Sequence, residues 1–223
     1  IYRSLFIQAR GVLRQELTHH LRSQQRVRQP RSGPQKPDGR GQIKDAISIS
    51  ERPAVIDDRA VPGHWEGDLL AGGKNSYIAT LVERHSRYAM LVKVPGKDTV
   101  SVVRALSRKI SRLPQELKGS LTWDRGMEMA NHKDFTMATD LQVYFCDPRS
   151  PWQRGSNENT NGLLRQYFPK GTDLSAFPRD YLDFVALRLN NRPRKRHDWL
   201  TPAEVLDELL SNPPQPPPVA LTA

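Results

Sequence analysis

The hydrophobic pattern after residue 60 begins with short β-type runs that turn residues separate. Three such runs come before any helical spacing, at residues 65–70, 77–83 and 88–94. Gly72, Gly73 and Lys74 join the first two runs, and they lack both the spacing and the final Ser or Thr of a phosphate-binding loop. The pattern therefore predicts a β-meander with a hairpin turn at these glycines.

Helical and strand patterns alternate in the second half of the chain. Apolar positions at three- and four-residue steps, with cap and stop residues, predict helices at residues 98–112, 131–140, 155–167, 179–191 and 201–210. Short strands are expected at residues 121–123 and 143–146. This order is that of an α/β, RNase H-like fold, in which a mixed five-stranded sheet is flanked by helices and a meander continues into parallel pairing.

The first 60 residues follow a different pattern. Apolar residues at helical spacing predict an extra amino-terminal amphipathic helix over residues 4–22, with Arg10, Arg14 and Arg22 off the apolar stripe. It packs on another domain, or it faces DNA or a second copy; both interpretations stay open. We expect the following domains: residues 1–27 as a basic helix left from or linked to a DNA-binding region, 28–60 as a linker, 61–210 as the core and 211–223 as a disordered Pro-rich tail.

Positive charge is concentrated near the start of the chain. The net charge of the 223 residues is +10, and residues 1–44 hold ten Lys and Arg against only Glu16 and Asp38. Such an arm is either a nucleic-acid contact or a solvated tail, and the acidic motifs described below favour nucleic acid.

Cysteine content and hydropathy indicate the compartment. A single cysteine, Cys146, excludes an internal disulfide and lies in an apolar run, so we expect it in the core. No apolar stretch has the length of a membrane span, and no signal-peptide pattern opens the chain. We therefore expect a cytoplasmic, nucleoid-associated protein that does not contact a membrane.

Three acidic residues stand in distinctive surroundings. Asp68 ends the stretch from His64, Asp124 follows Trp123 on the fourth predicted strand, and Glu158 follows a Pro- and Gly-containing loop. Taken alone, Glu158 reads as a first-turn carboxylate favoured by the helix dipole, with Asn157 able to cap the helix.

Together these motifs resemble the retroviral-integrase-like DDE transposases, most closely those of the insertion-sequence thirty family. The resemblance rests on Trp65 three residues before Asp68, on Asp124 followed by Gly126, and on Pro151-x3-Gly155-x2-Glu158-x2-Asn161-x2-Leu164. It covers roughly residues 45–210. The family's amino-terminal DNA-binding helices are not among the matched residues and the chain begins with Ile1, so we expect a fragment or a truncated copy.

The resemblance implies a catalytic core that hydrolyses DNA at element ends and then joins them to target DNA. Asp68, Asp124 and Glu158 would be the catalytic metal ligands, with Asp68 bridging two Mg²⁺ ions, for which Mn²⁺ can substitute. Hard cations take oxygen ligands, which suits three carboxylates, and without metal we expect these like charges to repel. The partners would be element-end and target DNA and at least one further copy of the chain. Two alternatives stay open, namely an RNase H-like nuclease without strand transfer and an inactive DNA-binding module.

Other acids compete for these roles. Glu66 shares a strand face with Asp68 and is either a metal ligand or half of an ion pair. Asp147 is interpreted as a turn residue, and Glu128 and Asp140 as surface charges.

Candidate DNA contacts surround Glu158. Asn161 and Arg165 share its helix face, and the resemblance implies a DNA contact at Arg165. Trp152 and Arg125 are further candidates, whereas Trp65 and Trp123 are expected in the core. The densest basic cluster contains Arg192, Arg194, Lys195 and Arg196, which either bind phosphates or form a solvated helix end.

Overall fold

The structure of the protein is a computed structural model that describes residues 43–53, 56, 61–148 and 150–212. The predicted helix of residues 4–22 and the predicted tail of residues 213–223 lie outside the described residues. Within the described part of the chain, no helix has the length and apolar character needed to cross a membrane.

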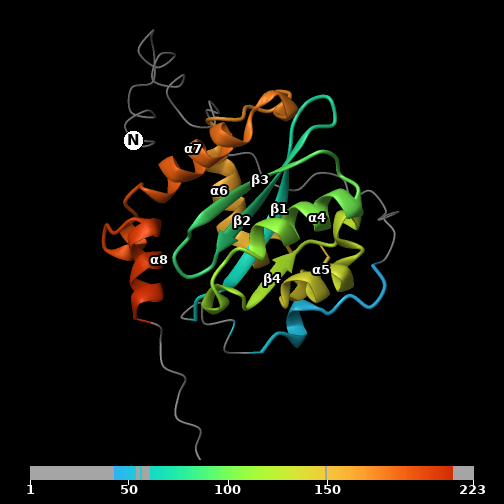
Figure 1. Cartoon of the computed structure of the whole chain (residues 1–223), viewed down its shortest axis with the longest axis horizontal. Coiled ribbons are helices and arrows are strands. Elements are labelled where there is room, and N and C mark those ends of the chain that lie inside the picture. Colours follow the sequence, from blue (N-terminus) through green and yellow to red (C-terminus); the bar gives the residue numbers. More distant parts are fainter. Residues whose placement is uncertain (1–42, 54–55, 57–60, 149, 213–223) are drawn as a thin grey trace, which may run out of the picture. The chain divides into compact units, whose positions relative to one another are not determined.

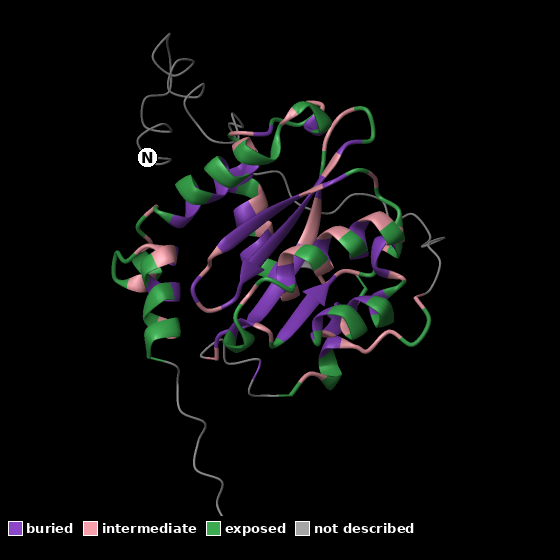
Figure 2. Cartoon of the chain, viewed as in Figure 1, coloured by how far each residue is buried: buried purple, intermediate pink, exposed green. Residues whose placement is uncertain are grey.

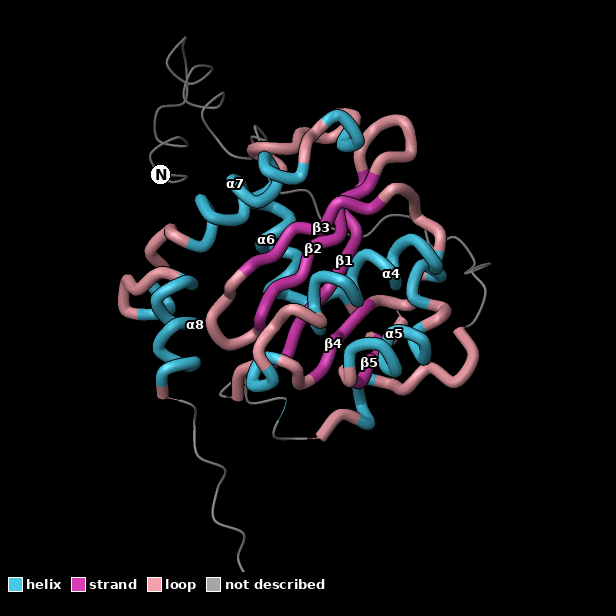
Figure 3. Tube along the Cα trace, viewed as in Figure 1, coloured by secondary structure: helices cyan, strands magenta, loops and turns pink. Residues whose placement is uncertain are grey.

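A mixed five-stranded sheet forms the centre of the described core. Its strands are β1 (His64–Ala71), β2 (Tyr77–Glu83), β3 (Ala89–Val94), β4 (Ser120–Trp123) and β5 (Gln142–Phe145). Their spatial order is β3-β2-β1-β4-β5, as the tube view shows (Figure 3). The first three strands pair antiparallel, whereas β4 pairs parallel with both β1 and β5. The predicted meander and its continuation into parallel strands are confirmed.

Helices begin and end close to the predicted residues. They are α4 (Thr99–Ile110), α5 (His132–Thr139), α6 (Gly155–Leu164), α7 (Arg179–Asn190) and α8 (Pro202–Ser211). Asp98 caps α4 through its side chain, as predicted, and Thr201 and Glu204 form a reciprocal capping box at the start of α8. Helix α6 ends three residues earlier than predicted, because the chain tightens into i→i−3 bonds, in which the N–H groups of Gln166 and Tyr167 bond the carbonyls of Leu163 and Leu164.

Two-residue alternation along the strands builds one apolar core on each face of the sheet. On β2, Ala79 and Leu81 pack into the core beneath α4 and α5, whereas Ile78 packs into the core beneath α6 and α7. On β1, Trp65 belongs to the first core and Leu70 to the second. The strands are accordingly buried nearly along their whole length (Figure 2), with α4 and α6 on opposite faces (Figure 1).

This alternation determines which way the acids of β1 face. Even-numbered positions of β1 lie on the same face as Leu70, so Glu66 and Asp68 face the layer that contains α6. Glu158 lies in the first turn of α6. The fold therefore places Asp68 and the Glu158 helix on one side of the sheet.

Described residues of the predicted linker pack beside the sheet. Ser48 forms a parallel bridge with Phe145, and Phe145 N–H bonds the Ile47 carbonyl at 2.8 Å. Ile49 is buried. These residues extend the sheet by one bridge at the β5 edge.

Candidate active site

Parallel pairing of β1 with β4 brings the first two acids near each other. Asp68 lies on β1, and Asp124 directly follows the last residue of β4. Asp124 Oδ1 accepts the N–H of Gly126 at 2.9 Å, which fixes the carboxylate in a local turn. A Cβ at Gly126 would lie 2.1 Å from Oε1 of Glu128, so a larger residue here would displace the end of the Glu128 side chain.

A buried arginine joins the two aspartates. Nη1 of Arg154 lies 3.4 Å from Oδ1 of Asp68, and Nη2 lies 3.6 Å from Oδ2 of Asp124. The same Nη1 donates to the Gly67 carbonyl at 2.8 Å. Only 7% of Arg154 is exposed. The guanidinium therefore supplies positive charge between two carboxylates that would otherwise repel each other.

The electrostatics of this trio follow from its burial. Burial raises the pKa of Asp68; Arg154 opposes that rise and the nearby charge of Asp124 adds to it. Burial by itself would lower the pKa of Arg154, but the carboxylates of Asp68 and Asp124 outweigh it and the pKa is raised. Arg154 is therefore a permanent cation at this position.

Asn161 brings α6, the helix that carries Glu158, to the same site. Glu158 is half-buried in the first turn of α6, and Asn161, one turn later, donates from Nδ2 to Oδ2 of Asp68 at 3.1 Å. Among the described residues, no three His, Cys, Asp or Glu side chains converge closely enough to form a metal site as they stand. The structure thus joins Asp68 to Asp124 through Arg154, and Asp68 to the Glu158 helix through Asn161.

Glu66 fixes the start of α6 from the neighbouring strand. Its Oε2 accepts the backbone N–H groups of Ser156 (2.9 Å) and Asn157 (3.0 Å), and its Oε1 accepts the Ser156 hydroxyl at 3.1 Å. Arg84 Nε lies 3.4 Å from Oε1, so the predicted ion pair of Glu66 is confirmed. Glu66 is fully buried. Its carboxylate satisfies helix N–H groups that would otherwise lack acceptors.

Asn157 does not cap α6, so that part of the sequence prediction is wrong. The capping position belongs to Arg154, which makes no side-chain cap bond. Asn157 instead donates from Nδ2 to the carbonyls of Glu66 (2.8 Å) and Thr80 (3.2 Å), and its Oδ1 accepts the Thr80 hydroxyl at 3.1 Å. This amide ties α6 to both β1 and β2 and so sets where Glu158 lies.

Other acids occupy structural positions. The prediction of Glu128 as a surface charge is wrong, because it is 4% exposed and its Oε1 accepts the Trp123 indole N–H at 3.3 Å. Asp140 is exposed in a left-handed conformation at the end of α5, as predicted. Asp147 accepts the Gln153 amide at 2.8 Å and the Ser48 hydroxyl at 3.3 Å. Trp65, Trp123 and Cys146 are buried as expected.

The predicted DNA contacts lie around the site in different environments. Arg165 donates to the Ala71 carbonyl at 3.0 Å, and the exposed Arg125 donates through Nε to the Cys146 carbonyl at 3.1 Å. Trp152 is 69% exposed within a 3₁₀ turn, Pro151–Arg154.

The basic cluster after α7 is partly built into the fold. Arg194 donates to the Leu189 carbonyl at 3.2 Å, and its backbone bonds the Leu200 carbonyl. Arg192 and Arg194 are half-buried, whereas Lys195 and Arg196 are exposed.

The donor atoms at this site fit a hard cation. Asp68 and Asp124 already share one positive group, and the Asn161 Oδ1 beside them is buried without a hydrogen-bond partner among the described residues. Carboxylate and amide oxygens are the ligands that Mg²⁺ prefers, with the remaining positions taken by water or substrate phosphate.

Sequence reasoning missed Arg154, Asn157 and the capping role of Glu66. Arg154 precedes Gly155 inside the motif that contains Glu158, and that position was its only sequence signal. A buried arginine has no hydrophobic periodicity that would reveal it.

The strand order, with Asp68 on β1 and Asp124 directly after the parallel strand β4, defines an integrase-type core of RNase H-like fold. In agreement, the family model described as Integrase core domain matches residues 58–151.

Full-length relatives identify the family. The chain is 52% identical to the transposase InsI for insertion sequence element IS30A of Escherichia coli K12 over 93% of this chain and 54% of that protein. It is 49% identical to the transposase for IS1086 of Cupriavidus metallidurans, over 96% of this chain and 62% of the relative. The chain belongs to the IS30 family of transposases, and it spans little more than half the length of these relatives.

Proposed function

We propose that this chain is the catalytic core of an insertion-sequence transposase that hydrolyses phosphodiester bonds at element ends and joins the freed 3′ hydroxyls to target DNA. The observation that carries the proposal is that Asp68 on β1 and Asp124 directly after β4 share one cationic group, the guanidinium of Arg154. The proposal is supported by the similarity to transposases, which are 49–52% identical to this chain over 93–96% of its length.

Asp68, Asp124 and Glu158 are the proposed metal ligands. Integrase cores typically depend on divalent metal, and two such ions activate the entering oxygen and stabilise the leaving oxygen of a phosphodiester. Asp68 supplies oxygen ligands from β1 and Asp124 from the turn directly after β4. Glu158 supplies a third carboxylate from α6, which Glu66 and Asn157 tie to the sheet. We infer Mg²⁺ as the physiological ion, with Mn²⁺ as a substitute.

The surroundings of the carboxylates suit a DNA substrate. Arg165 lies at the end of α6, the helix that carries Glu158, and Arg125 directly follows Asp124. The exposed Trp152 lies in the turn just before α6. Arginines position phosphates, and an exposed indole offers a stacking surface for a base. Since joining two element ends to one target needs two active sites, we infer that the active complex is at least a dimer of this chain.

The test compares Asp124→Asn with the unmodified chain on labelled element-end DNA and a target plasmid, with Mg²⁺ or Mn²⁺. The asparagine oxygen keeps the acceptor for the Gly126 N–H, so the turn is preserved while a metal ligand is lost. We expect nicking and joining to fall by at least a hundredfold, whereas the exposed Asp140→Asn control retains both, because asparagine tolerates a left-handed backbone. Survival of both activities in Asp124→Asn would refute the site, and nicking without joining in the unmodified chain would identify a nuclease.

A further inference from the structure

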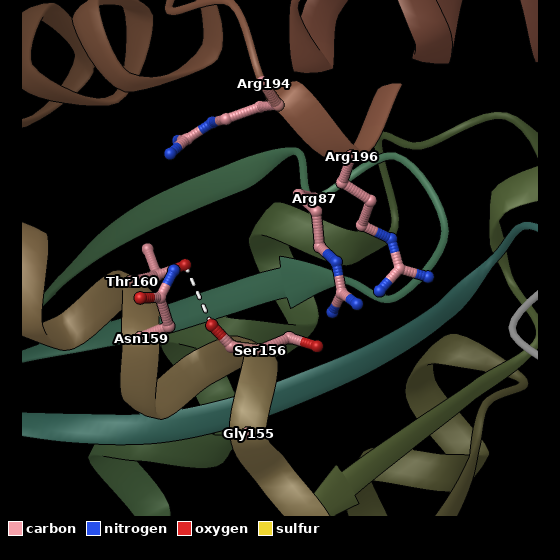
Figure 4. A pocket seen from close by; sticks show the side chains of 7 residues that line it. All are labelled: Arg87, Gly155, Ser156, Asn159, Thr160, Arg194 and Arg196. Atoms are coloured by element: carbon pink, nitrogen blue, oxygen red, sulfur yellow. Dashed lines mark hydrogen bonds between the residues drawn. The ribbon is translucent and has the colours of Figure 1, made fainter. Parts of the chain in front are cut away.

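A second basic site lies beside α6, away from the carboxylates. A cavity of about 430 Å³ is lined by Arg87, Arg194 and Arg196 and, from α6, by Gly155, Ser156, Asn159 and Thr160. In Figure 4 the side chains of Arg87 and Arg196 both point toward the start of α6, and the Arg194 side chain lies on the side of Asn159 and Thr160. No acidic residue is among these lining residues. Three guanidinium groups around one cavity favour a bound anion.

The arginines come from two segments that the fold holds together. Arg87 ends the turn between β2 and β3, with φ at +65°, a left-handed conformation that is uncommon for a long side chain. Buried Glu83 holds that turn, because its Oε2 accepts the N–H (2.6 Å) and the hydroxyl (2.7 Å) of Ser86. Strained backbone of this kind persists where the surroundings enforce it and is often functional.

The second segment follows α7. Arg194 precedes a short 3₁₀ turn, Lys195–His197, which contains Arg196, and the Arg194 side chain bonds the Leu189 carbonyl. Burial, followed by the charges of Arg196, His85 and Arg87, lowers the pKa of His197. Positive charge from both segments therefore accumulates at one place, and such a cluster attracts anions.

The cavity and the carboxylates use different flanks of α6. At about 100° per residue, Gly155, Ser156, Asn159 and Thr160 centre roughly 200° around the helix from Glu158, Asn161 and Arg165. The outer ridge between the flanks is open, because a Cβ placed at Gly155 or Gly162 would meet nothing within 4 Å. An extended polymer can therefore approach the α6 backbone closely and reach both flanks.

We propose that Arg87, Arg194 and Arg196 bind a backbone phosphate of the DNA strand that crosses α6, at a fixed distance from the reacting phosphodiester. This inference rests on the proposed function, since only a DNA substrate links the two flanks. A helix about 10 Å across corresponds to about three nucleotides at 3.4 Å per nucleotide. Planar guanidinium groups bind phosphate oxygens through paired hydrogen bonds, so the site positions the strand without reading its sequence.

The first experiment measures affinity and its salt dependence. Arg87→Gln/Arg196→Gln is compared with Arg104→Gln/Arg108→Gln, which removes the same charge from two exposed arginines of α4. Fluorescence anisotropy of a labelled DNA duplex in EDTA reports binding without metal. We expect the cavity variant to bind at least tenfold more weakly, with a log–log salt slope smaller by about one, and the control to change little. Equal behaviour of the two variants overturns the proposal.

A second measurement avoids substitution and any effect on folding. Phenylglyoxal modification of the unmodified chain, read by mass spectrometry, reports how accessible each guanidinium is. Saturating DNA is expected to slow modification of Arg87 and Arg196 several-fold and to leave Arg104 unchanged. Unprotected Arg87 and Arg196 under conditions where DNA is bound would overturn the proposal.

The outcomes separate this site from the proposed function. Asp124→Asn is expected to bind DNA with the affinity of the unmodified chain and to join no ends, whereas the cavity variant is expected to join ends at high DNA concentration or low salt. If Asp124→Asn still joins ends, the proposed function fails while the binding data still report on the cavity. If the cavity variant binds like the unmodified chain, only the phosphate site fails.

Discussion

Nη1 of Arg154 lies 3.4 Å from Oδ1 of Asp68, at a position where burial raises the pKa of that carboxyl group. The side chain of Asp68 is 24% exposed and that of Arg154 only 9%. At such a position an opposite charge offsets the repulsion that a second carboxylate causes. When no metal is bound, the guanidinium of Arg154 provides this opposite charge.

Arg154→Gln is expected to destabilise the metal-free chain and to make it more sensitive to Mg²⁺. Removing one partner of a buried ion pair costs about 3 kcal/mol, which corresponds to a Tm lower by about 6–12 °C in a domain of this size. Because Asp68 and Asp124 then repel each other without a counter-charge, Mg²⁺ should raise the Tm of the variant more than that of the unmodified chain. Thermal melts in EDTA and in Mg²⁺ measure both quantities.

Arg125→Gln is the matched control for that prediction. Arg125 directly follows Asp124 but is exposed, and its Nε bonds the Cys146 carbonyl rather than an acid. We expect its Tm to change little and its Mg²⁺ response to match the unmodified chain. Equal Mg²⁺-induced shifts in Arg154→Gln and Arg125→Gln would contradict the role given to Arg154.

Asn157→Ala is expected to loosen α6 from the sheet. Asn157 is fully buried. Its Nδ2 donates to the Glu66 and Thr80 carbonyls, and its Oδ1 accepts the Thr80 hydroxyl. Since alanine removes all three of these buried hydrogen bonds, stability should fall by about 2–3 kcal/mol. Asn159→Ala, on the exposed side of the same helix, should change stability by less than about 0.5 kcal/mol. Urea unfolding measures both values, and similar losses in the two variants would contradict this account.

The fold was predictable because its signals are local. Two-residue alternation defined the strands of the meander, three- and four-residue spacing defined α4, and Asp98 and Thr201 marked helix starts that the structure confirms. The continuation of the meander into parallel pairing followed from the expected topology. These features depend on residues that are close in sequence or on the general rules of sheet connection.

The detailed arrangement of the site was not predictable for the opposite reason. Ser156 N–H bonds a Glu66 oxygen 90 residues away, so α6 needs no cap from its own sequence, and the capping role assigned to Asn157 was wrong. Arg154 bonds the Gly67 carbonyl from 87 residues away. Contacts between a polar side chain and a distant backbone group leave no periodic pattern in a sequence.

His64 is expected to make stability depend on pH. Burial, followed by the charges of Arg84 and Arg52, lowers the pKa of His64 to about 4. The unfolded chain binds a proton near pH 6.5, whereas the folded chain does so only near pH 4, so this contribution is present above pH 6.5 and is lost as the pH falls toward 4. The loss approaches about 1.4 kcal/mol per pH unit within that window.

His64→Asn provides the comparison, because its amide can keep the bond that His64 Nδ1 makes with the Ser120 hydroxyl at 2.9 Å. Urea unfolding of both chains between pH 4 and 7 gives the free energy of unfolding of each chain as a function of pH. The difference between the two curves removes the effect of the carboxylates, which titrate in both chains. The stability of the unmodified chain relative to His64→Asn should fall as the pH is lowered from 6.5 to 4. A difference that stays constant from pH 7 to 4 would show that His64 does not titrate in this range.

Gly67→Ala is expected to disturb the strand that carries Asp68. A Cβ at Gly67 would lie 2.3 Å from Cζ3 of the fully buried Trp123, which itself precedes Asp124. Since neither the strand nor the indole has room to move, we expect the free energy of unfolding to fall by about 1–3 kcal/mol.

Gly162→Ala is the matched control. The same methyl group meets nothing within 4 Å there, and alanine should stabilise the interior of α6 by about 0.5–1 kcal/mol. Opposite signs of the two changes in urea unfolding are the expected result, and a Gly67→Ala chain as stable as the unmodified one would show that the indole of Trp123 does not pack against β1 as described.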